Sequence, residues 1–466
     1  MGVVLNILYG VVMLVTSPWL LWRYLRFGKN RRGWSQKLFG WVPRRVSDRP
    51  CIWFHAVSVG EVNLLAPVLQ RCQAKRPDME LVVSTSTETG YDLARQKYRE
   101  LTVFFFPLDF TWAVRNAIER TRPSLIVLAE LEVWPNFIRG ARVQQRLIDP
   151  PNYVATGKSR FEIPLAIING RLSESSWRGY QRLKWLLQSS FQRLNLVAAQ
   201  NETYADRFRE LGCQHDAVIV TGSVKYDGVQ TDRMNEKTVQ LRQLADVQPS
   251  EFVFLAGSTQ LEEDLLAARV YLELRELHPQ LRLILAPRHP DRCAALVRAL
   301  EELGLAVTRR SSLASAETAS APNDEGIQPA QRVHQPTVLL IDVIGELGAW
   351  WGVADAAYVG GSMGARGGQN MIEPAAYGIP VSFGPHTKNF QTVVSQLLSA
   401  DAATVVHDQV ELNQFLTRAL TDPAWAKQIG IRAQQEMQKH HGASDRTVEK
   451  LFELLKMPDS GLSRDE

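Results

Sequence analysis

Several carboxylates follow apolar runs of the chain, at positions where acid–base chemistry would be expected. Glu61 follows the run Cys51–Val57 and opens a helical pattern, and Glu130 and Glu132 directly follow the run Leu125–Ala129. A carboxylate that is partly buried at such a position has a raised pKa and can act as a general base. In an extended segment Glu130 and Glu132 point to opposite faces, so only one can reach the same cleft as Glu61. The alternative is that Glu61 only stabilises the start of a helix.

Polar and basic residues follow other apolar runs in the same way. Lys225 comes after Val218–Val220, Arg288 comes after Leu281–Leu285, and the segment Asn169–Arg171 ends a further run. Lys225 is either an anion contact or a surface lysine. Arg288 is either a contact to a phosphate or a base, or one partner of a salt bridge within a loop.

A glycine-rich segment, Gly360–Pro374, joins the apolar run Ala354–Val359 to a helical pattern. Glycine lets main-chain N–H groups approach a phosphate closely, and the start of a helix favours negative charge. Glu373 at this helix start could accept hydrogen bonds from both hydroxyls of a ribose. The alternative is a tight turn with a carboxylate that stabilises the helix. The segment contains neither G-x-G-x-x-G nor G-x-x-x-x-G-K-[ST], and the missing dinucleotide fingerprint argues against a dehydrogenase.

The elements that position these residues are apolar runs alternating with amphipathic helical patterns, which indicates parallel sheets covered by helices on both faces. Ligands of such sheets bind at the carboxyl ends of the strands. A polar stretch after Asp227 separates two sets of runs, so we predict domains at residues 29–230 and 231–466. Two doubly wound domains, the second with a nucleotide-type loop, match a two-domain glycosyltransferase fold that holds a nucleotide-sugar between its domains. The remaining predicted strands are Leu81–Ser84, Val103–Phe106, Leu165–Ile168, Leu196–Ala199, Phe252–Ala256, Val338–Ile341 and Pro380–Pro385.

The composition narrows the classes of function. The net charge of +4 over 466 residues is too small to indicate nucleic acid as a partner. The four cysteines are widely spaced without a C-x-x-C motif, which fits reduced thiols in a cytosolic compartment. The nine histidines form no H-E-x-x-H motif, so we predict no metal site.

The N-terminal segment Val3–Trp22 carries no charge and has about the length of a bilayer-spanning helix. No small-residue cleavage site precedes the basic residues that follow it, so a cleaved signal peptide is not expected. Positive charge on this side of the segment places the rest of the chain in the cytoplasm. We therefore predict a membrane anchor over residues 1–28, with an interfacial helix as the alternative. The basic residues are Arg23, Arg26, Lys29, Arg31 and Arg32.

Aromatic and basic residues are interleaved in the next segment, which contains Trp34, Lys37, Trp41, Arg44 and Arg45. Such a segment suits an anionic headgroup layer. The alternative is a solvated basic linker.

Five strings of residues occur in order along the chain and together carry a specific resemblance. They closely resemble motifs of the 3-deoxy-D-manno-octulosonic acid (Kdo) transferases, glycosyltransferase family 30, over nearly the whole chain. The strings are Phe54–Glu61, Glu130–Asn136, Pro287–Pro290, Ile344–Leu347 and Gly367–Pro374.

The resemblance implies an inner-membrane enzyme of lipopolysaccharide synthesis that has a GT-B fold, faces the cytoplasm and needs no metal or other cofactor. It implies transfer of Kdo from CMP-Kdo to the tetra-acylated lipid A precursor, lipid IVA. By motif, Glu61 is the general base, and Glu132 and Lys225 stabilise the transition state. The residues implied to bind CMP are Pro287, Arg288, His289, Ile344, Gly345, Glu346, Asn370, Met371, Ile372 and Glu373.

Two segments depart from the family pattern, since Gln144–Arg160 and Ser311–Gln335 are longer and more polar than the motif spacing requires. Both lie between motifs, so we expect them to be surface loops. Ser362–Arg366 varies within the family that the chain resembles and is assigned no role. Two rival hypotheses remain at this point: a membrane-associated GT-B enzyme that uses a UDP-sugar and a lipid acceptor, and a nucleotide-binding scaffold protein without catalytic activity.

Overall fold

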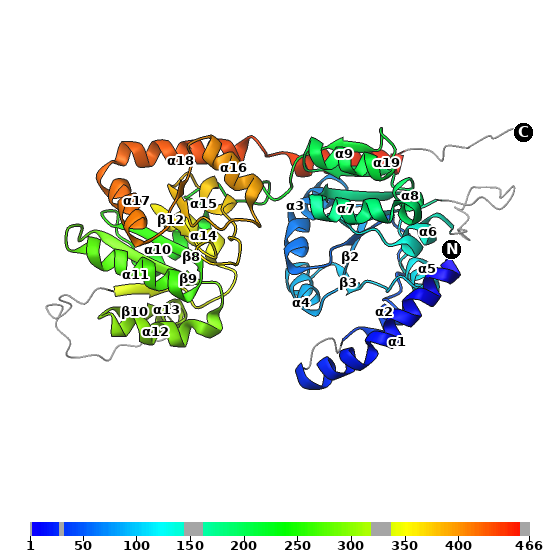
Figure 1. Ribbon diagram of the computed structural model, residues 1–466, viewed down its shortest axis with the longest axis horizontal. Helices are drawn as coiled ribbons and strands as arrows, with labels where there is room; N and C mark the ends of the chain where they lie inside the picture. Colours follow the sequence, from blue (N-terminus) through cyan, green and yellow to red (C-terminus); the bar gives the residue numbers. More distant parts are fainter. Residues whose placement is uncertain (1, 28–31, 144–161, 318–336, 457–466) are drawn as a thin grey trace, which may run out of the picture. The chain divides into compact units, whose positions relative to one another are not determined.

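The computed structural model describes residues 2–27, 32–143, 162–317 and 337–456. These residues fold as two compact α/β units. The first unit extends to Gly228 and also takes in the chain from His441 on, and the second unit is Val229–His440. Each unit is built around a sheet of seven parallel strands with helices packed on its faces (Figure 1).

The sheet of the first unit has the strand order β3-β2-β1-β4-β5-β6-β7. Side chains alternate between its two faces, because Trp53 belongs to the hydrophobic core on one face and its neighbours Ile52 and Phe54 belong to the core on the other. Burial on both faces explains why these strands are continuous apolar runs in the sequence. The strands are β1 (Cys51–His55), β2 (Glu80–Thr85), β3 (Thr102–Phe105), β4 (Leu125–Ala129), β5 (Leu165–Gly170), β6 (Leu196–Ala199) and β7 (Val218–Val220).

The helices of the first unit are α1 (Gly2–Phe27), α2 (Trp34–Phe39), α3 (Val59–Lys75), α4 (Glu88–Lys97), α5 (Thr111–Thr121), α6 (Pro135–Val143), α7 (Glu174–Arg182), α8 (Lys184–Phe191), α9 (Glu202–Leu211) and α19 (Ala443–Lys456). Helix α3 begins where the sequence places Glu61 near a helix start, with Ser58 as its N-cap.

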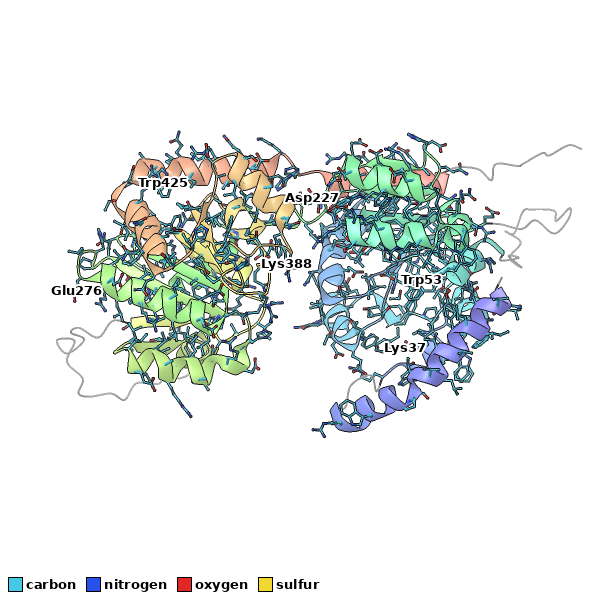
Figure 2. The ribbon with its side chains drawn as sticks, viewed as in Figure 1. Lys37, Trp53, Asp227, Glu276, Lys388 and Trp425 are labelled. Carbon is cyan, nitrogen blue, oxygen red and sulfur yellow. The ribbon has the colours of Figure 1, made fainter. Side chains whose placement is uncertain are left out.

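The C-terminal helix α19 packs on α3 of the first unit, although the sequence analysis assigned residues 231–466 to one domain. Val448 and Leu451 of α19 are buried in the same core as β1. The carboxylate of Asp227, labelled in Figure 2, accepts the main-chain N–H of Gly442 at 2.6 Å and that of Ser444. An amphipathic helix must bury its apolar stripe, and α19 does so in the first unit rather than the second.

The sheet of the second unit has the order β10-β11-β9-β8-β12-β13-β14. Its strands are β8 (Phe252–Thr259), β9 (Leu281–Pro287), β10 (Ala306–Arg309), β11 (Thr337–Leu340), β12 (Ala356–Val359), β13 (Val381–Phe383) and β14 (Thr404–Val405). The two edge strands β10 and β14 were not predicted, because they are short and their side chains are only partly buried or exposed.

The helices of the second unit are α10 (Glu236–Leu244), α11 (Leu261–Arg275), η1 (Pro290–Arg292), α12 (Cys293–Glu302), α13 (Arg310–Glu317), α14 (Leu347–Val353), α15 (Ile372–Ala376), α16 (Gln391–Ser399), α17 (Gln409–Thr421) and α18 (Pro423–Gln438). The insertion expected at Ser311–Gln335 thus begins inside helix α13, and its residues 318–335 lie outside the described part of the chain. The other expected insertion, Gln144–Arg160, also lies outside it.

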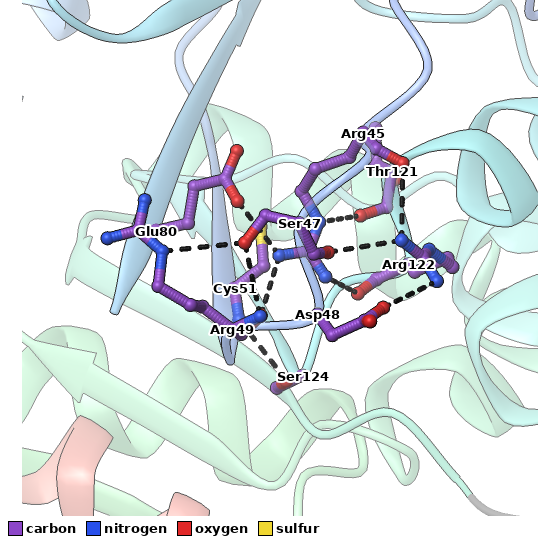
Figure 3. Close-up of polar contacts among 9 residues, drawn as sticks. All are labelled: Arg45, Ser47, Asp48, Arg49, Cys51, Glu80, Thr121, Arg122 and Ser124. Atoms are coloured by element: carbon purple, nitrogen blue, oxygen red, sulfur yellow. Dashed lines mark hydrogen bonds and ion pairs between the residues drawn. The ribbon is translucent and has the colours of Figure 1, made fainter. Parts of the chain in front are cut away.

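Arg45 links the segment that precedes β1 to α5 and β2 through hydrogen bonds (Figure 3). Its guanidinium donates to the main-chain oxygen of Thr121 at 2.9 Å, to that of Arg49 at 2.6 Å and to the Glu80 carboxylate at 3.0 Å. The Arg45 side chain is 7% exposed. Arg45 is therefore a structural residue, and the expectation that it faces lipid headgroups was wrong.

Helix α1 forms over most of the segment that was predicted as a membrane anchor, residues 1–28, and it lies beside α5 (Figure 1). Among the helices of the described residues, none combines the length and the apolar character that crossing a bilayer requires. The prediction of a spanning anchor is therefore not supported. The side chains of Asn6 and Tyr9 in this helix are hydrogen-bonded to Thr111 and Asp109 of the first unit.

Candidate active site

Glu61 lies in the first turn of α3, directly beyond the carboxyl end of β1. Its carboxylate accepts the Val57 N–H at 2.8 Å and the Ser58 hydroxyl at 2.9 Å. Burial raises the pKa of Glu61, and these two hydrogen bonds partly oppose that rise. Glu61 therefore stabilises the start of the helix and is also a carboxylate with a raised pKa, and its role as a general base stays a prediction.

Glu132 lies in the loop that joins β4 to α6. Burial raises its pKa to about 7, a hydrogen bond from Trp134 opposes the rise, and the charges of Glu61 and Glu130 add to it. The Trp134 indole N–H donates to Oε2 of Glu132 at 2.7 Å. The structure thus brings the carboxylates of two different loops to the same end of the sheet.

Glu130 also faces this group, which the sequence analysis did not expect. It has a φ of 57°, a left-handed conformation that is uncommon for a residue other than glycine. The chain leaves the extended conformation at Glu130, so the expected alternation of faces between Glu130 and Glu132 does not apply. The charge of Glu130 raises the pKa of both Glu61 and Glu132. The only signal in the sequence was the Glu-x-Glu spacing.

Lys225 places a positive charge beside Glu130 and near Glu61. Its Nζ lies 3.2 Å from Oε1 of Glu130, and its charge lowers the pKa of Glu61. Asn169, at the end of β5, holds the turn before Lys225, because its side-chain oxygen accepts the Ser223 hydroxyl and the Val224 N–H at 3.1 Å each. Glu61, Glu132 and Lys225 of the sequence prediction are thus brought together, and Glu130 and Asn169 are added.

The first half of the glycine-rich loop in the second unit is occupied by a carboxylate of the protein itself. Glu263, which is 2% exposed, accepts the main-chain N–H groups of Gly361 at 2.7 Å, Ser362 at 2.9 Å and Met363 at 3.0 Å. The Tyr358 hydroxyl donates to the same carboxylate at 3.0 Å. These N–H groups therefore do not receive a phosphate, and the phosphate-cradle hypothesis does not hold for this half of the loop.

The second half of the loop has a different environment. Gly367 and Gly368 have φ values of 92° and 84°, which only glycine adopts readily. The Arg366 guanidinium lies 3.3 Å from Nε2 of His289. Lys388, labelled in Figure 2, packs over Gly367, since a Cβ placed there would lie 2.5 Å from Cγ of Lys388. Basic side chains thus surround a glycine turn, and no motif indicated Lys388.

Asn370–Glu373 follow this turn. The Asn370 side chain donates to Oε1 of Glu373 at 2.9 Å, and burial raises the pKa of Glu373. Met371 and Ile372 are 0% and 3% exposed, so neither offers a ligand an exposed side chain.

The remaining predicted CMP contacts lie at the ends of β9 and β11. Pro287 ends β9, and the main-chain N–H of Arg288 donates to the Thr259 oxygen at 3.1 Å. Ile344 is 86% exposed and precedes Gly345, which has a φ of 92°. These residues lie at the carboxyl ends of strands, where ligands of parallel sheets bind.

Glu346 has structural partners. Its carboxylate accepts two hydrogen bonds from Arg310, at 2.9 and 3.0 Å, and one from the Trp350 indole at 3.3 Å. Among the described residues, no cluster of three or more His, Cys, Asp or Glu side chains could hold a metal ion.

Comparisons with known proteins agree with this architecture. Residues 32–148 and 150–228 match the family model of 3-deoxy-D-manno-octulosonic-acid transferase (kdotransferase). The chain is 28% identical over 407 residues to the 3-deoxy-D-manno-octulosonic acid transferase of Haemophilus influenzae, covering 87% of this chain and 86% of that protein. It is 27% identical over 446 residues to the enzyme of the same name from Chlamydia muridarum, covering 95% and 94%.

A solved structure of a glycosyltransferase from Rickettsia africae superposes on the chain with a TM-score of 0.52 at 12% identity, covering 88% of this chain and 100% of that one. This similarity shows the fold, which is GT-B-like with two parallel seven-stranded sheets. The family model and the two relatives show that the chain is similar to the 3-deoxy-D-manno-octulosonic acid transferases.

Proposed function

We propose that the chain is a Kdo transferase that uses CMP-Kdo as donor and lipid IVA as acceptor. The observation that carries the proposal is the arrangement of Glu61, Glu132 and the Glu130–Lys225 ion pair at one end of the first sheet, within the residues that match the family model. The names of the relatives support Kdo as the transferred sugar.

In the proposed reaction, Glu61 takes the proton of the acceptor hydroxyl. The freed oxygen attacks the anomeric carbon of Kdo, the bond from that carbon to the phosphate oxygen breaks, and CMP leaves with the bonding electrons. Burial makes the Glu61 carboxylate a stronger base than an exposed one. A positioned base contributes about 10²–10⁴-fold to the rate.

Glu132 and Lys225 are assigned to the charges that develop during the transfer. Positive charge builds up on the sugar as its bond to the phosphate breaks, and an ionised Glu132 would stabilise it. Lys225 would interact with an anionic group of the donor, while Glu130 holds its ammonium group. Both groups are already in place before the reaction, so little reorganisation is needed.

The nucleotide of the donor is assigned to the second unit. His289, Arg366 and Lys388 place basic groups around the Gly367–Gly368 turn, and Ile344 is an exposed apolar side chain at the end of β11. The Arg366 and Lys388 side chains would interact with the negative charge of CMP, and we propose that no metal ion is needed.

We further propose that the enzyme lies on the cytoplasmic face of the inner membrane through the outer face of α1. Eight apolar side chains on this face are exposed, and aromatic side chains of α2, α5 and the adjoining loop are exposed as well. Apolar helix faces with aromatic and basic neighbours bind at lipid interfaces. The exposed residues are Val3, Val4, Ile7, Leu8, Val11, Val12, Leu14, Val15, Trp34, Phe39, Trp41 and Trp112.

Mass spectrometry of the lipid product tests the proposed reaction. The purified chain would be mixed with freshly generated CMP-Kdo, lipid IVA and EDTA. A mass gain of one or more Kdo units would support the donor, the acceptor and the independence from metal. No gain, with the CMP-Kdo shown to be intact, would reject this donor and acceptor. In that case, competition between CMP and UDP for binding would test the rival hypothesis of a UDP-sugar donor.

A further inference from the structure

Helix α1 is hydrogen-bonded to the loop that precedes α5. The Tyr9 hydroxyl donates to Oδ2 of Asp109 at 2.9 Å. The Asn6 side chain donates to the Thr111 hydroxyl at 2.8 Å and accepts the Thr111 N–H at 3.1 Å. Its oxygen also accepts a hydrogen bond from the Asn136 side chain at 3.3 Å. These contacts join α1 to both α5 and α6.

Asp109 in turn holds the first turn of α6. Its buried carboxylate accepts the main-chain N–H of Asn136 at 3.0 Å and that of Phe137 at 2.7 Å. The Asn136 side chain donates back to the Asp109 main-chain oxygen at 2.6 Å. The N–H groups of a first helical turn have no partner within the helix, so a carboxylate from another loop that satisfies them fixes where the helix begins.

The start of α6 is also the end of the loop that carries Glu132. Helix α6 begins at Pro135, three residues after Glu132, and the intervening Trp134 donates its indole N–H to the Glu132 carboxylate at 2.7 Å. A continuous set of contacts therefore runs from Tyr9 through Asp109 and the first turn of α6 to Glu132.

We propose that Asn6 and Tyr9 are positioning residues, so that docking of α1 on the first unit sets the place of Glu132. This inference rests on the proposed role of Glu132 in Kdo transfer. It gives α1 a function beyond attachment to a membrane.

The two faces of α1 allow this function to be separated from lipid binding. Leu5, Asn6 and Tyr9 face the protein and are buried or half-buried, whereas Val11 and Val15 on the outer face are 53% and 72% exposed. A substitution on one face therefore leaves the contacts of the other in place.

The experiment compares three variants of the full-length chain with wild type, using lipid IVA dispersed in detergent. Tyr9→Phe removes only the hydroxyl that reaches Asp109. Tyr271→Phe is the matched control, since its hydroxyl donates to the Thr337 main-chain oxygen at 3.5 Å within the second unit. The double variant Val11→Gln/Val15→Gln changes only the outer face.

Two readouts are measured, the split between kcat and KM and the fluorine NMR signal of Trp134 in protein labelled with 5-fluorotryptophan. The Trp134 signal is assigned by Trp134→Phe. For Tyr9→Phe we expect kcat to fall about tenfold to a hundredfold with little change in the KM for CMP-Kdo, because a small displacement of a reacting group costs that much. We also expect the Trp134 signal to move or broaden.

The control variants define what supports or contradicts the inference. Tyr271→Phe should leave both readouts unchanged, and the double variant should lose binding to anionic vesicles while keeping the Trp134 signal of wild type. An unchanged kcat and an unchanged Trp134 signal in Tyr9→Phe would overturn the inference. If Tyr9→Phe does not fold, Asn6→Ala decides by the same two readouts. If wild type transfers no Kdo, the proposed function fails, and the Trp134 signal alone still decides the inference.

Discussion

The carboxylate of Glu263 accepts the main-chain N–H of Gly361 at 2.7 Å and thereby takes the place that a phosphate would have in the glycine-rich loop. The same carboxylate also accepts the N–H groups of Ser362 and Met363 and the hydroxyl of Tyr358. A buried charge is tolerated only when it is fully hydrogen-bonded, as this one is. The loop is therefore rigid before any donor binds, which reduces the entropy cost of binding.

Replacing Glu263 should loosen this loop. Glu263→Gln keeps one acceptor oxygen but replaces the other by an NH2 group, which cannot accept the main-chain N–H groups. Because these buried donors lose their partner, we expect the free energy of unfolding of the second unit to fall by roughly 2–4 kcal/mol. Faster amide hydrogen exchange at Gly361–Met363 would measure the loosening directly. The neighbouring exposed Glu262→Gln is the matched control and should change neither quantity. Equal exchange in both variants would show that Glu263 does not hold the loop.

Glu61→Gln should separate binding from transfer. Glutamine keeps the size of the side chain but cannot take the proton of the acceptor, so we expect kcat to fall by about 10²–10⁴-fold. The affinity for CMP should not change, because the proposed CMP contacts lie in the second unit. Steady-state kinetics and CMP titration measure the two quantities, with the exposed Glu100→Gln as control. A variant that turns over at the wild-type rate would exclude Glu61 as the base.

The pKa of Glu132, raised by burial to about 7, predicts the pH dependence of the reaction. The charged groups near Glu132 are Glu61 on α3 and Glu130 in its own loop, and Tyr180 on α7 is affected by its charge. Since the proposed mechanism needs ionised Glu132, kcat should rise with pH through a midpoint near 7. In Glu132→Gln this midpoint should be absent, and its persistence would assign it to another group.

The same shift predicts an effect on stability. A carboxyl whose pKa is higher in the folded than in the unfolded protein stabilises the fold at pH values below the unfolded value of 4.5, and this contribution is lost as the pH rises through the folded value of about 7. Glu132→Gln cannot ionise. We therefore expect its free energy of unfolding to exceed that of wild type at pH 8 and the gap to narrow toward pH 5, as measured by urea unfolding. A constant gap across this range would contradict the assignment of the raised pKa.

The sequence was sufficient to predict most of the sheets, because strands buried on both faces are continuous apolar runs and the carboxyl ends of parallel strands meet at one edge. The same rule pointed to Glu61 and to the Glu130–Glu132 segment, whereas the choice of Glu132 and Lys225 came from the resemblance to the family. The rule could not indicate that Glu263 is buried against the glycine-rich loop. Acidic residues in the first turn of a helix, such as Glu262–Asp264, are expected to be exposed to solvent. The sequence also did not reveal that Asn6 and Tyr9 of α1 contact the first unit. They are two polar residues in an otherwise apolar segment, and such a segment was interpreted as a membrane anchor.

Lys225 should set the working pH of the candidate site through its ion pair with Glu130. Lys225→Met removes the cation that lowers the pKa of Glu61, so the pKa of Glu61 should rise further. Because the proposed reaction needs ionised Glu61, the midpoint of the pH–rate profile should move to higher pH. The double variant Lys225→Met/Glu130→Gln removes one charge of each sign and should bring the midpoint back toward 7. If the single variant keeps the wild-type midpoint, Lys225 does not act on these carboxylates.

The Gly367–Gly368 turn offers the sharpest test of the donor site, because the same loop contains a matched control. Gly367 has a φ of 92°, and a Cβ at this position would lie 2.5 Å from Cγ of Lys388. Gly367→Ala should therefore strain the turn and displace Lys388, and we expect CMP to bind about tenfold more weakly. Gly364 has no atom within 4 Å of an added Cβ and no positive φ, so Gly364→Ala should leave binding unchanged.

Isothermal titration of both variants with CMP separates the possible outcomes. Weaker binding by Gly367→Ala alone would place the nucleotide against the second half of the loop, next to Lys388 and Arg366. Equal binding by both variants and wild type would exclude this turn from the donor site. Since the N–H groups of the first half are already satisfied by Glu263, that outcome would move the phosphate away from the glycine-rich loop altogether, toward the ends of β9 and β11 where Arg288 and Ile344 lie.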